Sequence, residues 1–162
     1  MRFFNQLQPT LPTWAIRRVL HIYWRFARGL TMGVRAIVLD GENRVFLVRH
    51  TYVAGWHLPG GGVETGETAL EALGRELQEE ACIRMEGDPV THGVFFNHQV
   101  SRRDHVVVYV IRNFVVLRLK EPDREIAECG FFPLDRLPDG TTPATRRRLA
   151  EILDGEPLSP TW

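Results

Sequence analysis

One stretch of this sequence constrains the chain more than any other: three consecutive glycines at 60–62, followed by a segment crowded with carboxylates. Glu76, Glu79 and Glu80 are spaced i, i+3 and i+4, so in a helix they project from one face. Like charges at that spacing destabilise a helix by about 0.2–0.5 kcal/mol per pair. A divalent cation that binds carboxylate oxygens would offset this repulsion. The sequence therefore predicts a metal site on this helix.

The helix itself is predicted from local signals. Thr68 and Glu71 fit a capping box, in which the N-cap hydroxyl and the N3 carboxylate satisfy each other's backbone amides. Leu70, Leu73 and Leu77 form an apolar stripe at helical spacing, and the three glutamates lie off it. The ordinary alternative to a metal site is an acidic helix face that is simply exposed to solvent. The triple glycine favours the metal site, because glycines leave backbone groups open to a ligand.

With these residues in view, the segment from Gly61 to Ile83 resembles the Nudix box. The pattern of that family runs glycine, five residues, glutamate, seven residues, arginine-glutamate, an aliphatic residue, any residue, glutamate-glutamate, any residue, glycine and an aliphatic residue. The matching positions are Gly61, Glu67, Arg75, Glu76, Leu77, Glu79, Glu80 and Ile83. Cys82 stands where the pattern has its last glycine. If Cys82 closes the helix in a left-handed conformation, its Cβ costs on the order of 1 kcal/mol, and we expect no loss of chemistry.

The resemblance implies an α/β fold, namely an α/β/α sandwich with a mixed β-sheet in which the box forms a strand–loop–helix unit. It also implies a pyrophosphohydrolase that cleaves the diphosphate bond of a nucleoside diphosphate linked to another moiety, with Mg²⁺ or Mn²⁺ as cofactor. In the family, the positions matching Glu76, Glu79 and Glu80 hold the metal, helped by a backbone carbonyl that matches Gly60. The expected partner is therefore a small nucleotide-type substrate.

The expected catalytic residues follow from the same resemblance. Glu67 and Arg75 match a pair that ties the loop to the helix and so fixes the direction of the metal ligands. The general base varies among Nudix enzymes. The candidates here are Glu76 and Glu79 within the box, and Glu125 and Glu128 from a later loop. Glu125 also sits where some relatives supply an extra metal ligand, although both later acids fit an ordinary charged surface loop equally well.

Substrate-binding residues are indicated by side-chain chemistry alone. Arginine forks suit phosphate oxygens, and an aromatic ring can stack on a nucleobase. The candidates are Arg49, Tyr52, Arg102 and Arg103, with His50 and His105 as further ones. The alternative to a substrate role is that the arginines are ordinary surface residues and that His105 simply packs at the start of a strand. The substrate stays open among oxidised nucleoside triphosphates, nucleotide sugars and ADP-linked compounds.

Composition limits the classes of protein to which the chain can belong. A chain of 162 residues suits one domain, and its net charge of zero does not favour nucleic-acid binding. Cys82 and Cys129 are too few for a disulfide framework or a zinc site. We find no cleavable leader or long apolar run, so a soluble cytoplasmic protein is expected. We divide the chain into residues 1–30, a Nudix domain at 31–156 and a loosely held C-terminal tail at 157–162.

The N-terminal segment is predicted to add an amphipathic helix at residues 13–28. Its arginines share one stripe with His21, and aromatic and aliphatic residues cover the rest. Such a helix is typical of packing on its own domain or on a second subunit, as in a homodimer. Contact with an anionic membrane surface or another docking partner is a rival interpretation. A further rival is a nucleotide-sensing module with a Nudix fold that does not cleave its ligand.

The remaining elements are short strands and one helix. Strands are predicted at Val34–Leu39 and Arg44–Arg49, joined by a hairpin-like turn, and at Val90–Asn97. An apolar run at His105–Leu119 is expected to bend or break near Arg112-Asn113, and a last strand to begin at Phe131. Thr142 followed by a proline predicts the start of a helix over 143–153.

Overall fold

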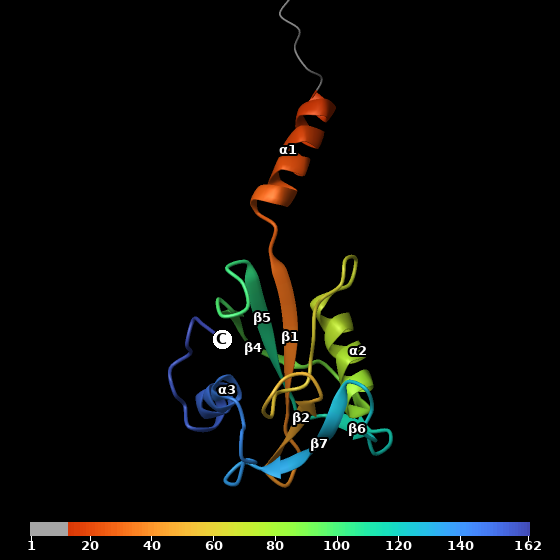
Figure 1. Cartoon of the computed structure of the whole chain (residues 1–162), viewed down its shortest axis with the longest axis vertical. Helices are drawn as coiled ribbons and strands as arrows, with labels where there is room; N and C mark the ends of the chain where they lie inside the picture. The colour runs from red at the N-terminus through yellow and green to blue at the C-terminus, as the bar shows by residue number, and fades with distance from the viewer. Residues whose placement is uncertain (1–12) are drawn as a thin grey trace, which may run out of the picture. The chain divides into compact units, whose positions relative to one another are not determined.

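The computed structural model describes residues 13–162 and divides into two units, one ending at Leu30 and the other starting at Thr31. The first unit contains helix α1 (Thr13–Ala27), which confirms the helix predicted for this segment (Figure 1). The Arg28 guanidinium lies over the Trp24 ring, 4.3 Å from its centroid. The packing of α1 on the domain or on a second subunit stays a prediction. No helix among residues 13–162 is both long and apolar enough to cross a membrane.

The second unit is built on a mixed sheet, as the sequence predicts. Its strands run in the order β1 (Thr31–Val38), β5 (Asp104–Ile111) and β4 (Val90–Phe96). β1 pairs with β5 in parallel, and β4 pairs with β5 antiparallel. Two antiparallel pairs accompany this sheet: β2 (Arg44–His50) with β7 (Ile126–Pro133), and β3 (Ile83–Met85) with β6 (Phe114–Val116).

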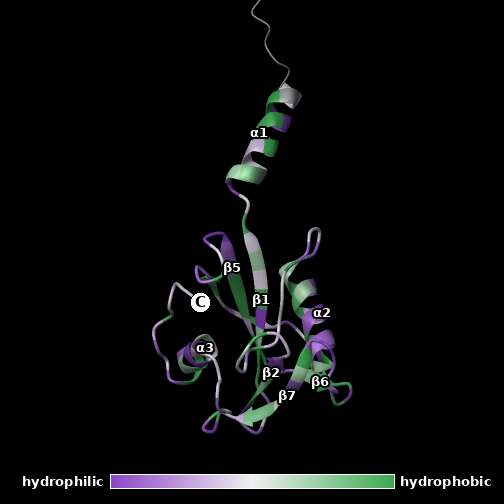
Figure 2. Ribbon diagram, in the orientation of Figure 1, coloured by the Kyte–Doolittle hydropathy of each residue, from purple (hydrophilic) through white to green (hydrophobic). Residues whose placement is uncertain are grey.

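The side chains of β1 and β5 alternate between two cores, one on each face of the sheet. On one face, Val34 packs in a core with the buried side of α2 (Ala69–Ala81). On the other face, Ile37 lies in a second core with Leu149 of α3 (Pro143–Leu153). Figure 2 shows β5 hydrophilic at its start and hydrophobic along the rest of its length. Helices cover both faces, which confirms the expected α/β/α arrangement.

Both ends of α2 have the predicted geometry. The Thr68 hydroxyl accepts a hydrogen bond from Glu71 N at 3.2 Å, and the Glu71 carboxylate accepts one from Thr68 N at 2.8 Å. At the other end, Cys82 has φ 54° and ψ 35°, which is the left-handed conformation. Few residues other than glycine take this conformation, because the Cβ crowds the backbone. The box therefore retains its left-handed helix end although cysteine replaces the glycine.

Removal of the Thr68 hydroxyl is expected to destabilise the domain. In Thr68→Ala the Glu71 amide loses its acceptor, and an N-cap of this kind contributes about 1 kcal/mol to the free energy of unfolding. The measurement is urea unfolding, with Thr68→Ser, which keeps the hydroxyl, as the matched control. Equal stabilities of the alanine variant and the wild-type protein would contradict this expectation.

Some strand predictions need correction. The predicted turn does connect β1 and β2, and a bridge joins Leu39 to Val45. The predicted hairpin-like turn is therefore confirmed, but beyond that bridge β1 pairs with β5 and β2 pairs with β7. The last strand begins at Ile126 rather than Phe131, since the buried Ile126 side chain already belongs to the core. The long apolar run breaks at residues 112–113, as predicted, and gives β5 and β6.

The C-terminal segment is held more firmly than expected. Thr161 forms a parallel bridge with Phe96 at the end of β4. Phe96 N donates to the Pro160 carbonyl at 3.0 Å, and Trp162 N donates to the Phe96 carbonyl at 3.0 Å. The Trp162 side chain packs against the second core. The expectation of a loosely held tail is therefore wrong, because the segment bonds to a strand that is distant in sequence.

Candidate active site

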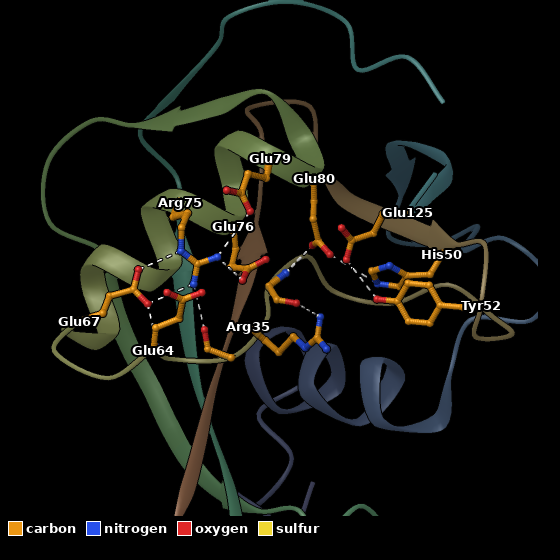
Figure 3. Close-up of polar contacts among 12 residues, drawn as sticks. Arg35, His50, Tyr52, Glu64, Glu67, Arg75, Glu76, Glu79, Glu80 and Glu125 are labelled. Atoms are coloured by element: carbon orange, nitrogen blue, oxygen red, sulfur yellow. Dashed lines mark hydrogen bonds and ion pairs between the residues drawn. The ribbon is translucent and has the colours of Figure 1, made fainter. Parts of the chain in front are cut away.

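The glycine loop lies along the edge of β1. Val34 N donates to the Gly61 carbonyl at 2.8 Å, and Ala36 N donates to the Pro59 carbonyl at 2.9 Å. Gly60 has a φ of 138°, and a Cβ on it would overlap the Val34 carbonyl oxygen. Both the conformation and the close approach of two backbones thus require glycine at position 60. This pairing brings the loop to the carboxylates of α2 (Figure 3).

Glu80 is the most buried of the three glutamates expected to hold the metal, with 3% of its surface exposed. One of its carboxylate oxygens accepts a hydrogen bond from Gly60 N at 2.7 Å. Burial raises the pKa of the Glu80 carboxyl to about 7. A carboxylate kept from water in this way is stable as an anion only beside a compensating positive charge. Glu80 therefore marks the inner end of the candidate site.

Side chains from outside the box meet Glu80 (Figure 3). His50 Nε2 lies 3.6 Å from Glu80 Oε1, and the Tyr52 hydroxyl donates to Glu125 Oε1 at 3.2 Å. One candidate ligand atom from each of His50, Glu80 and Glu125 lies within 4.8 Å of the other two. Burial, aided by the charge of Arg35, lowers the pKa of His50 and keeps its imidazole neutral. The structure thus places Glu125 beside a glutamate of the box.

Arg75 connects the carboxylates to the loop. Its Nε donates to Glu67 Oε1 at 2.9 Å, and its Nη1 donates to Glu76 Oε1 at 2.7 Å. Its Nη2 donates to the Gly62 carbonyl at 3.0 Å. The hydrogen bonds from Arg75 lower the pKa of Glu67 and keep that side chain ionised. Arg75 therefore ties Glu67 and Glu76 to the glycine loop, and the catalytic role expected for Glu67 and Arg75 stays a prediction.

The other two expected metal ligands of α2 differ in how firmly they are held. A Cβ on Gly61 would overlap the Glu76 carboxylate, so the loop and this side chain are in direct contact. Burial raises the pKa of Glu76, although Arg75 opposes the shift. The side chain of Glu79 is 61% exposed and lies 3.5 Å from Arg75 Nη1. The Gly60 carbonyl accepts a hydrogen bond from Arg35 Nη1, and its role as a metal ligand stays a prediction.

The donor set fits a hard divalent cation. Mg²⁺ and Mn²⁺ prefer carboxylate and carbonyl oxygens. Among the described residues, the acids whose oxygens converge within 4.8 Å are Glu80 and Glu125, together with His50, whereas Glu76 and Glu79 lie outside this group. His50 adds a neutral imidazole whose buried Nδ1 has no hydrogen-bond partner within residues 13–162. The buried Glu80 carboxylate, whose pKa is raised, is the charge that such a cation would compensate.

A cavity of about 450 Å³ lies next to this cluster. Tyr52, a predicted substrate-binding residue, lines it together with His50. Sequence reasoning missed other residues in its lining, namely Arg35, His57, Asn97 and Trp162. Arg35 had a usable signal, because it is the one charged residue of a mostly apolar strand. The other three come from separate segments, and no local pattern connects them.

The remaining predicted substrate-binding residues lie elsewhere. Arg49 Nη2 donates to Glu128 Oε2 at 2.8 Å across the β2–β7 pair, so these two side chains form a surface ion pair. Arg102 and Arg103 lie in the turn between β4 and β5, outside the lining of the cavity. The His105 ring packs against Phe96 with 5.4 Å between ring centroids. The predicted substrate roles of Arg102, Arg103 and His105 gain no support from these positions. Arg49 does line a hollow together with His50 and Tyr52.

Comparison with known proteins shows to which protein family this α/β/α fold with its carboxylate cluster belongs. A family model described as the NUDIX domain matches residues 29–152. The chain therefore belongs to the Nudix family and is a hydrolase of that family.

Two curated relatives come from bacteria. The chain is 30% identical over 105 residues to an RNA pyrophosphohydrolase of Francisella tularensis subsp. mediasiatica (strain FSC147). The match covers 60% of this chain and 68% of that protein. The chain is also 35% identical over 101 residues to a putative mutator protein MutT4 of Mycobacterium tuberculosis (strain CDC 1551 / Oshkosh). That match covers 61% of this chain and 41% of that protein. The first of these relatives is named for the hydrolysis of a pyrophosphate bond.

Solved structures show the same fold. The MutT NUDIX hydrolase from Burkholderia pseudomallei superposes with a TM-score of 0.65 at 28% identity, covering 75% of this chain and 97% of that one. A UDP-X diphosphatase superposes with a TM-score of 0.62 at 25% identity, covering 90% of this chain and 73% of that one.

Proposed function

We propose that this protein hydrolyses the diphosphate bond of a nucleoside diphosphate linked to a second moiety, and that Mg²⁺ or Mn²⁺ is required. The products are a nucleoside monophosphate and a second phosphorylated compound. The observation that carries the proposal is the buried Glu80 carboxylate, which meets Glu125 and the glycine loop at one point. Similarity to an RNA pyrophosphohydrolase and to a UDP-X diphosphatase supports this class of reaction.

The cation would be held by side chains and one backbone carbonyl of this site. The proposed ligands are Glu76, Glu79, Glu80, Glu125 and the carbonyl of Gly60. When bound, a divalent cation neutralises charge on the phosphoryl oxygens and lowers the pKa of a coordinated water. Arg75 directs Glu76 through a hydrogen bond of 2.7 Å, and Gly60 N directs Glu80 through another of 2.7 Å. Ligands fixed in this way need little reorganisation when substrate arrives.

The candidates for the general base differ in how firmly other groups already hold them. Glu128 is the weakest candidate, because its carboxylate pairs with Arg49 on the surface. Glu76 has its Oε1 oxygen occupied by a hydrogen bond from Arg75 at 2.7 Å, so that oxygen is not free to accept a proton from water. Glu79 is mostly exposed, and Glu125 has one oxygen bonded to Tyr52. We propose that Glu79 or Glu125 accepts the proton of the attacking water.

A substrate panel tests the proposed function. Oxidised and ordinary nucleoside triphosphates, nucleotide sugars and ADP-linked compounds are each incubated with the protein and Mg²⁺ or Mn²⁺. Phosphate released after coupling to a phosphatase measures turnover. We expect turnover of at least one nucleoside diphosphate derivative, and we expect a chelator to stop it. A folded protein that turns over no member of the panel with either ion would refute the proposal.

A further inference from the structure

The cavity beside the carboxylate cluster has one aromatic wall from the last residue of the sequence. Its volume of about 450 Å³ lies in the range of small-molecule sites. His50 and Tyr52 line the cavity, and both also contact the acidic side chains of the cluster. A ligand that fills the cavity therefore reaches the carboxylates. Trp162 lines the same cavity.

Main-chain hydrogen bonds hold Trp162 in place independently of its indole. Its N–H donates to the Phe96 carbonyl at 3.0 Å, and its main-chain oxygen accepts from Arg147 Nη2 at 2.7 Å. The carbonyl of Thr161 accepts from Arg148 Nη1 at 3.1 Å, and Arg148 is completely buried. Because these bonds involve the backbone, they persist when the side chain of residue 162 is changed.

The surroundings of the indole combine an aromatic surface with polar groups. Phe95 flanks it with 6.3 Å between ring centroids and an interplanar angle of 62°. Arg35 and Asn97 line the cavity with it. Asn97 Nδ2 donates to Asp104 Oδ2 at 2.7 Å, which leaves Asn97 Oδ1 as an acceptor for a ligand. An aromatic face, an amide acceptor and a guanidinium together suit a nucleobase that is joined to a phosphate chain.

We propose that Trp162 stacks on the nucleobase of the substrate and thereby selects nucleotides over diphosphates that lack a base. This inference rests on the proposed function for the kind of ligand, but its test does not require turnover. Stacking on an aromatic side chain strengthens binding whichever base is present, because every base has a π face. Trp162 is thus a specificity residue that contacts the base, distant from the bond that breaks.

The experiment measures binding to the full-length chain by calorimetry. The probes are AMP, GMP, CMP, UMP and, as the ligand without a base, ribose 5-phosphate. At least one nucleoside monophosphate is expected to bind the wild-type protein more tightly than ribose 5-phosphate and to quench tryptophan fluorescence. Trp162→Ala weakens nucleotide binding by roughly 5- to 150-fold, removes the quenching and leaves ribose 5-phosphate binding unchanged. Trp162→Phe keeps most of the affinity.

A third variant separates stacking from packing. Trp162→Leu keeps apolar bulk against the core but has no π face, so it binds nucleotides as weakly as Trp162→Ala while its melting temperature stays near that of Trp162→Phe. The inference is overturned if no monophosphate binds wild type more tightly than ribose 5-phosphate. It is also overturned if the alanine variant binds nucleotides as wild type does, or loses both ligand types equally. Stacking by Trp162 without turnover on the substrate panel would overturn the proposed function alone.

Discussion

The Glu80→Gln variant is expected to lose more than about 100-fold in kcat/KM, because removing even a group that only orients a metal ligand costs about 10–100-fold. Glutamine has nearly the same shape as glutamate, and its amide oxygen can still accept the hydrogen bond that Gly60 N now donates to the carboxylate. The change therefore removes the buried negative charge and leaves the packing intact. Because that charge is kept from water, we expect the variant to melt no lower than the wild-type protein when a chelator is present. Steady-state kinetics and thermal unfolding measure the two effects.

The matched control for this substitution is Glu86→Gln. It removes the same charge from an exposed acid in the turn between β3 and β4, where the side chain pairs only with Arg84 among the described residues. Its kcat/KM is expected to equal that of the wild-type protein. A folded Glu80→Gln protein that hydrolyses substrate as fast as the Glu86→Gln protein would refute the assignment of Glu80 to the metal site.

Alanine substitution at the three consecutive glycines is expected to give three different results. Gly60→Ala is the most damaging, because the new Cβ overlaps the Val34 carbonyl and the φ of 138° is strained for any side chain. Strain of this kind costs on the order of 1–3 kcal/mol by itself, and the overlap with backbone adds to it. Both the melting temperature and kcat/KM therefore fall, since the loop must leave the edge of β1.

Alanine substitutions at the two neighbouring glycines are expected to show the effect on activity apart from the effect on stability. In Gly61→Ala the Cβ meets the Glu76 carboxylate, a flexible group that can move away, so the fold survives and the displaced ligand lowers kcat/KM. Gly62→Ala is the matched control, because no atom lies within 4 Å of its added Cβ. Melting temperatures and kinetics of the three variants provide the measurement. Equal behaviour at positions 60 and 62 would show that the loop does not lie against β1 as described.

The parts of the structure that the sequence predicts well depend on local signals. The capping box at Thr68 and the left-handed end at Cys82 both lie within one helix and its two ends. The leucine stripe is confirmed only in part, because Leu73 and Leu77 are buried but Leu70 is 46% exposed. Glu76 and Glu80 share a face of that helix by spacing alone, so this placement needs no knowledge of the rest of the chain. The ion pair between Glu67 and Arg75 is almost as local, since the two residues belong to one loop–helix unit.

The parts that the sequence does not predict depend on long-range pairing. Arg49 is chemically suited to phosphate, but the register of β2 and β7 places it opposite Glu128, which occupies its guanidinium. Arg35 reaches the cavity from β1, whose strand partner β5 lies far along the chain. Trp162 joins the site only because the last residues bond to Phe96. Contacts between distant segments leave no trace in a short window of sequence, so these roles became visible only in the fold.

The bonds that hold residues 160–162 have a practical consequence for anyone who shortens this protein. The backbone of Phe96, at the end of β4, pairs with Pro160 and Trp162, and the Trp162 side chain packs against the second core. A protein that stops at residue 159 would leave these backbone groups without their partners and would lack one wall of the cavity. It should therefore melt at a lower temperature than the 162-residue chain.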